Sequence, residues 1–408
     1  MKRAKQRSTS TRTVTISALA WALSITGCVN APSADDIVID SDRMAEAAEL
    51  YEQIEARHSR SLDMKDFSLE YLEWGDKNGI PLVWLHGYTS SSFELAEAGP
   101  VLASMGYHVY ALTYRGHGRS QVEDYDFSIY TIADDVADFM QQLGIDRAVI
   151  GGWSLGGHIS SAFYASYPTR VSAIVLVDGG AMWPRLITEA YAAEQQGHDF
   201  ATAEVVISDP HQIVFETREK GVEWVLASYF SNYVRPLDAA MTAYAHSYLL
   251  PGSSGEWGLH YDHAQLMGSW ADLDDLAGSH RLKLLPRSFQ TILPEVIYRN
   301  LDVPVLLIDP TGDDDNVLFR RSSYYRDLAE QHPRWIEYVE YSDTPHAAHL
   351  NRPEWFLRDM KRLMARIDRV KADCPYCQLT GSTNGDTRKF AKLRWQYATG
   401  RTRPLYRA

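Results

Sequence analysis

One serine lies where an enzyme would place a nucleophile. Ser154 follows the apolar run 148–153 and has a glycine two positions before it, Gly152, and another two positions after it, Gly156. Glycines at this spacing leave room for a sharp turn from a strand into a helix, which lifts the serine hydroxyl clear of a sheet. The helix that follows also presents free N–H groups to developing negative charge. The spacing therefore predicts a nucleophilic serine.

Alternating strands and helices must position this serine. After a helix at 42–57 and alternating strands within 61–74, apolar strands are predicted at 81–85, 107–112, 148–153, 171–177, 303–308 and 335–341, with helices at 129–143, 159–167, 319–331 and 353–370. This alternation is typical of an α/β fold with a mostly parallel central sheet and helices on both faces. Between 181 and 300 the sequence becomes aromatic, helix-rich and irregular, which predicts a large helical cap inserted into the core.

Four landmarks, taken in chain order, resemble the α/β-hydrolase fold family over roughly residues 60–370. They are the turn His86-Gly87, the loop 115–118, the turn at Ser154 and the closing segment at His346. The closing segment departs mildly from the usual family pattern, because Pro345 stands where a glycine is common. The resemblance implies a Ser-His-Asp triad.

His346 is the candidate base of that triad. It follows the last predicted strand and precedes the last predicted helix, where the family places its histidine. A base here would take the serine proton, provided that an acid holds its ring in one tautomer. His349 is its close rival, and we expect it to pack or hydrogen-bond nearby.

The acid and the oxyanion donors are also assigned by resemblance. Asp315, which follows the strand 303–308, lies at the position that the family favours, and Asp178, which closes the strand 171–177, is the alternative. The backbone N–H groups of Tyr88 and Leu155 occupy the family's oxyanion positions, where donors contribute a few kcal/mol each.

The expected function is that of a serine hydrolase acting through an acyl-enzyme on a small carboxylic ester or lactone. An aminopeptidase or amidase of the proline-iminopeptidase type, a carbon–carbon bond hydrolase and a non-catalytic ligand-binding protein stay as alternatives. We expect no cofactor, and no metal, because His260 and His263 lack a third ligand at suitable spacing.

The N-terminus is typical of an exported protein. The first 28 residues carry five basic and no acidic side chains, and a short apolar segment leads to Leu23-Ser24-Ile25-Thr26-Gly27-Cys28. This end resembles the lipobox of bacterial lipoproteins, which implies that Cys28 is lipidated and anchors the chain to a membrane of the cell envelope. Without lipid, the chain would be secreted or periplasmic.

The other two cysteines and the charge distribution complete the organisation. Cys374 and Cys377 would form a small disulfide in an oxidising compartment. The residues from 379 onward are basic, whereas the body is strongly acidic within a net charge of −13, which disfavours nucleic acid as a partner. We expect a signal peptide at 1–28, a tether and leading helix at 29–57, a core at 58–180 and 301–370, a cap at 181–300 and a tail at 371–408.

Overall fold

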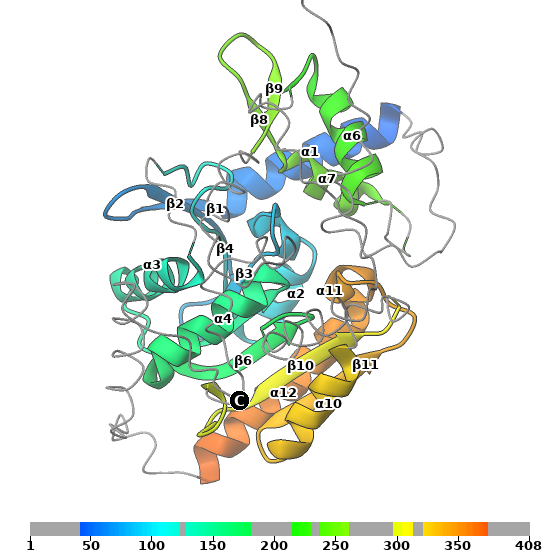
Figure 1. Ribbon diagram of the computed structural model, residues 1–408. Coiled ribbons are helices and arrows are strands. Elements are labelled where there is room, and N and C mark those ends of the chain that lie inside the picture. The colour runs from blue at the N-terminus through cyan, green and yellow to red at the C-terminus, as the bar shows by residue number, and fades with distance from the viewer. Residues whose placement is uncertain are drawn as a thin grey trace, which may run out of the picture.

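The centre of the molecule is a twisted eight-stranded sheet in the order β1-β2-β4-β3-β5-β6-β10-β11 (Figure 1). The computed structural model describes residues 41–122, 128–180, 214–230, 235, 237–260, 297–312 and 321–373. The strands are β1 Ser59–Asp63, β2 Ser68–Trp74, β3 Ile80–Leu85, β4 Tyr107–Thr113, β5 Ala148–Trp153, β6 Val171–Val177, β10 Val305–Pro310 and β11 Ile336–Tyr341. The pairs β1–β2 and β2–β4 are antiparallel, and the other pairs are parallel.

Helices cover both faces of the sheet, which confirms the predicted α/β fold. They are α1 Ser41–His58, α2 Ala98–Ser104, α3 Ile129–Gln142, α4 Leu155–Ser166, α10 Arg321–Gln331, α11 Ala348–Asn351 and α12 Pro353–Asp373, with short 3-10 turns at Ser92–Leu95 and Pro168–Arg170. Side chains of α2 and α12 pack on one face, and side chains of α3, α4 and α10 pack on the other.

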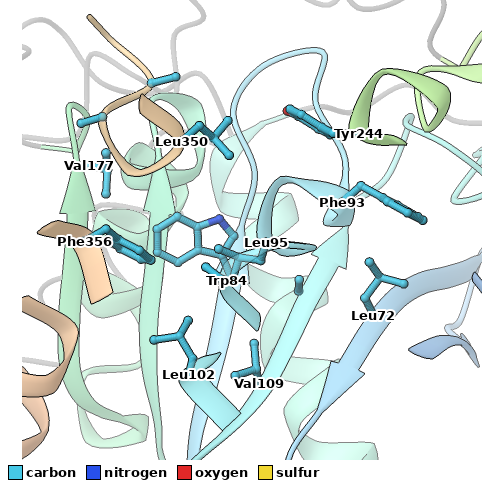
Figure 2. Packing of buried hydrophobic residues seen from close by; sticks show 14 of the residues in the cluster. Leu72, Trp84, Phe93, Leu95, Leu102, Val109, Val177, Tyr244, Leu350 and Phe356 are labelled. Carbon is cyan, nitrogen blue, oxygen red and sulfur yellow. The ribbon is translucent and has the colours of Figure 1, made fainter. Parts of the chain in front are cut away.

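The strand β3 shows why both faces are covered. Leu82 and Trp84 point into the layer of α2 and α12, whereas Val83 and Leu85 point into the layer of α3 and α4. Successive strand residues face opposite sides, so a continuous apolar run requires helices above and below it. Figure 2 shows the first of these layers, with Phe356, Leu95 and Leu102 around the indole of Trp84.

The described part of the inserted segment combines helices with a small sheet. It contains α6 Arg218–Tyr229 and α7 Ala239–His246, together with a three-stranded sheet in the order β7-β9-β8. Its strands, β7 Val214–Phe215, β8 Leu249–Pro251 and β9 Trp257–Leu259, are too short to display an alternating pattern in the sequence. The inserted segment, predicted as a helical cap, therefore contains a small sheet as well as helices.

The helix α1 joins this segment to the core. It packs against α7 (Figure 1). The ring of its Tyr51 stacks on Phe93 at 4.8 Å, while the guanidinium of Arg218 lies 4.3 Å from the centre of the Tyr51 ring. Within the described ranges, no helix combines the length and the apolar character needed to cross a membrane.

Candidate active site

Ser154 occupies a strained turn between β5 and α4. Its backbone angles are φ 51° and ψ −114°, although residues other than glycine rarely adopt a positive φ. The turn closes only around glycines, because a Cβ atom on Gly156 would lie 1.8 Å from the carbonyl oxygen of Leu85, and one on Gly152 would lie 2.4 Å from the carbonyl carbon of Gly156. The predicted strand–turn–helix at this serine is present.

Asp178 follows β6 and also has a positive φ, 46°. Its side chain is fully buried, and its Oδ2 accepts a hydrogen bond from Nδ1 of His346. Because a carboxylate oxygen only accepts, this contact places the histidine proton on Nδ1 and leaves Nε2 as the basic nitrogen. The hydroxyl of Tyr325 lies 3.4 Å from the other carboxylate oxygen.

The partner of His346 is therefore not the acid that the family pattern favoured. Asp315 lies outside the described residues, and the position beside Nδ1 is taken by Asp178, the alternative. The physical reason is the sheet order. The strand β6 lies directly beside the serine strand β5, with Val177 opposite Trp153, so the residue after β6 emerges next to the residue after β5.

The segment that carries His346 is hydrogen-bonded to Trp153, the residue before the serine. The indole N–H of Trp153 donates to the carbonyl oxygen of His346 at 2.9 Å, and the two rings lie 5.1 Å apart. The rival histidine has a different environment, because His349 is buried with its Nε2 3.1 Å from Oε1 of Glu94. His346, rather than His349, is thus the histidine paired with an acid at the serine.

The two backbone N–H groups that are expected to bind the oxyanion lie at the start of a helix and after the end of a strand. Leu155 is the first residue of α4, and Tyr88 follows β3 in the segment 86–91, hereafter the oxyanion loop. A Cβ atom on Gly87 would lie 2.4 Å from the Trp153 ring, so this loop is seated against the residue before the serine. The loop is strained as well, since Thr89 has a φ of 62°.

Three residues of the inserted segment hold the oxyanion loop from above. Ser90 Oγ is hydrogen-bonded to the hydroxyl of Tyr244, Ser91 Oγ to Ser247 Oγ at 2.7 Å, and the carbonyl oxygen of Thr89 to Nε2 of His260 at 3.0 Å. Burial lowers the pKa of His260 to about 4, so its ring is neutral and donates one proton to Thr89. Sequence patterns alone gave no sign of these contacts.

His158, on α4, is buried close to the pair. Burial lowers its pKa to about 3, a change that the carboxylate of Asp178 opposes and the imidazole of His346 reinforces. Its Nδ1 accepts the N–H of Gly180 at 3.2 Å. It is therefore a neutral packing residue at physiological pH. Among the described residues, no three His, Cys, Asp or Glu side chains are grouped to hold a metal ion.

The remaining predicted positions lie outside the described ranges. These are the lipidation site Cys28, the cysteine pair Cys374 and Cys377, and the basic tail.

Comparisons with known proteins support this reading of the fold. Residues 80–204 match the family model described as alpha/beta hydrolase fold. The chain is 36% identical over 108 residues to a non-heme chloroperoxidase of Streptomyces lividans, a match that covers 26% of this chain and 39% of that relative. It is 27% identical over 251 residues to a bifunctional esterase/perhydrolase of Acinetobacter calcoaceticus, covering 61% of this chain and 79% of the relative.

A solved structure extends the similarity over most of the chain. The crystal structure of E-2-(acetamidomethylene)succinate hydrolase superposes with a TM-score of 0.54 at 20% identity, covering 75% of this chain and 98% of that one. At this identity the likeness concerns the fold. The matched stretch spans 39% of the length of the chloroperoxidase, so activity has to be argued from the site.

Proposed function

We propose that this chain, which has the α/β-hydrolase fold, is a serine hydrolase that acts through an acyl-enzyme on a small carboxylic ester or lactone. The observation that carries the proposal is a serine in a strained strand-to-helix turn, whose preceding residue is bonded to a histidine that an aspartate holds in one tautomer. The relative named esterase/perhydrolase supports the same class of reaction.

The triad of the proposal is Ser154, His346 and Asp178. Ser154 Oγ attacks the carbonyl carbon while Nε2 of His346 takes the hydroxyl proton. Asp178 stabilises the imidazolium through Nδ1–H. The carbonyl oxygen becomes an oxyanion that accepts hydrogen bonds from the N–H groups of Tyr88 and Leu155.

The reaction then proceeds in two stages, formation of the acyl-enzyme and its hydrolysis. The leaving alkoxide takes the proton from His346, and the acyl group stays on Ser154. Water next attacks the acyl carbon while His346 accepts its proton, and a second oxyanion forms in the same place. Collapse releases the carboxylic acid and returns the proton to the serine.

The test combines a fluorophosphonate probe with an aryl ester substrate. The wild type is expected to be labelled and to hydrolyse the ester, whereas Ser154→Ala loses both while keeping its melting temperature within a few degrees. Ser172→Ala, on β6, is the matched control and keeps both activities. A native wild type that neither reacts with the probe nor turns over esters would favour a non-catalytic binding protein. Anilide and vinylogous diketone substrates test the amidase and carbon–carbon alternatives.

The location of the protein is a separate part of the proposal. We propose that lipid on Cys28 anchors the chain to the bacterial cell envelope, because acyl chains contribute about 0.8 kcal/mol per buried CH₂. Cys28→Ser is expected to move the protein from the membrane fraction to the soluble fraction, whereas Cys374→Ser leaves it in the membrane fraction. Retention of Cys28→Ser in membranes washed with high salt would show that another feature holds it there.

A further inference from the structure

A buried carboxylate lies beneath the oxyanion loop. Glu94, in the short turn after that loop, has a fully buried side chain, although charged groups are rarely buried without partners. Its Oε2 accepts the backbone N–H of Gly87 at 2.9 Å and the hydroxyl of Ser90 at 2.9 Å. These two bonds lie on either side of Tyr88, whose N–H is the expected oxyanion donor. The carboxylate therefore fixes the backbone that carries this donor.

The other oxygen of Glu94 faces the core and the histidine segment. Oε1 accepts the indole N–H of Trp84 at 2.8 Å and lies 3.1 Å from Nε2 of His349. Trp84 is immobilised among Phe356, Leu95 and Leu102 (Figure 2). His349 is the second residue of α11 and follows His346 by three positions in the sequence. Glu94 thus bonds the oxyanion loop and the central strand β3, and it lies against the histidine that follows the candidate base.

From these contacts we infer that Glu94 is a positioning residue, which presets the oxyanion loop relative to His346 for the reaction proposed above. An oxyanion donor is effective only when it is already aimed at the position of the developing charge. The loop is strained at Thr89, so it would relax without bonds that hold it. Two hydrogen bonds to Glu94 hold the loop in place, one from the backbone N–H of Gly87 and one from the hydroxyl of Ser90.

Replacement by glutamine makes a sharp test. Glutamine has nearly the same shape, but one of its two polar atoms is an NH₂ donor. In either orientation this NH₂ faces an N–H group that can only donate: the backbone N–H of Gly87 on one side, or the indole N–H of Trp84 on the other. Glu94→Gln is therefore expected to displace the oxyanion loop without leaving a cavity in the core. Glu97→Gln is the control, because Glu97 is exposed and its carboxylate pairs with Arg235 rather than with the oxyanion loop.

The readout compares an aryl ester with the matched thionoester. Sulfur accepts hydrogen bonds weakly, so an intact oxyanion site accelerates the ester far more than the thionoester. Glu94→Gln is expected to lower kcat for the ester roughly 10- to 100-fold, with KM changed less than about threefold, because loss of one oxyanion donor costs about 10²–10³ in kcat. The ester-to-thionoester ratio of kcat falls as well. Glu97→Gln keeps kcat and the ratio within about twofold.

The outcomes separate this inference from the proposed function on which it rests. Ester turnover that Ser154→Ala abolishes establishes the hydrolase, and its absence in the wild type overturns both. With turnover established, a folded Glu94→Gln that keeps its kcat or its ester-to-thionoester ratio overturns the positioning role alone. If Glu94→Gln does not fold, Ser90→Ala, which removes the bonds of Ser90 to the carboxylate and to Tyr244, is compared with Tyr244→Phe, which removes only the second of these from the loop. A lower ratio in Ser90→Ala than in Tyr244→Phe supports the role, and equal ratios overturn it.

Discussion

Asp178 and His346 lie 168 positions apart in the chain, yet the carboxylate of one accepts the Nδ1–H of the other. The contact joins the end of β6 to the segment that follows β11, across the intervening strand β10. It leaves Nε2 of His346 as the basic nitrogen of the ring. The proposed chemistry depends on this contact more than on any other.

Asp178→Asn is expected to lower kcat by about 10⁴, because an amide NH₂ in place of a carboxylate oxygen selects the wrong histidine tautomer. Asp315→Asn is the matched variant, since Asp315 is the acid that the family pattern favours. It should leave kcat within about threefold. Steady-state hydrolysis of an aryl ester by both proteins measures this. A large loss in Asp315→Asn with little change in Asp178→Asn would reverse the assignment.

Trp153→Phe should remove one hydrogen bond and keep an aromatic ring against Gly87. The lost bond is the one from the indole N–H to the carbonyl oxygen of His346. A neutral hydrogen bond contributes about 0.5–1.5 kcal/mol, so kcat is expected to fall roughly 3- to 10-fold while the melting temperature changes little. Trp335→Phe, on the far side of the sheet, controls for general effects of losing an indole. Equal kinetics in Trp153→Phe and the wild type would show that the bond does not position the histidine.

The turn at Ser154 should store backbone strain that glycine relieves. At φ 51° and ψ −114° an L-residue costs on the order of 1–3 kcal/mol, whereas glycine adopts such angles readily. Both Ser154→Ala and Ser154→Gly are expected to be inactive. Ser154→Gly should be the more stable of the two by about 1 kcal/mol, even though glycine gains entropy in the unfolded chain. Urea denaturation of the two variants checks this, and equal midpoints would contradict it.

Buried neutral histidines should make the fold sensitive to mild acid. Burial lowers the pKa of His260 from its ordinary value of 6.5 to about 4, and burial with the nearby Arg218 lowers that of His246 to about 4. Between these values the unfolded chain binds protons that the folded chain does not, so stability is complete above about pH 6.5 and falls as the pH drops toward 4.

The measurement for this prediction is the melting temperature at about pH 7 and about pH 5. His260→Gln keeps a donor for the carbonyl of Thr89 but cannot titrate, so its melting temperature should fall less than that of the wild type over this interval. His332→Gln tests a second histidine whose pKa burial lowers, so its melting temperature should also fall less than that of the wild type. A fall in His260→Gln as steep as in the wild type would exclude His260 as a source of the acid sensitivity.

The sequence alone determined the features that depend on neighbours in the chain. The apolar strands, the glycines around Ser154, the helix after it and the histidine between the last strand and the last helix all follow from local composition and spacing, because turns and alternation are decided within a few residues. The fold class followed from the order of these elements.

Only the tertiary structure decided which distant groups meet. Asp178 follows β6 and His346 follows β11, and the order β5-β6-β10-β11 brings the two side chains together beside the end of β5, a result that no local pattern contains. Glu94 resembles any acid in the first turn of a helix, where negative charge is common, until burial under the oxyanion loop reveals its partners. Hydrogen bonds from Tyr244 and His260 to that loop are likewise set by packing between segments more than 150 residues apart.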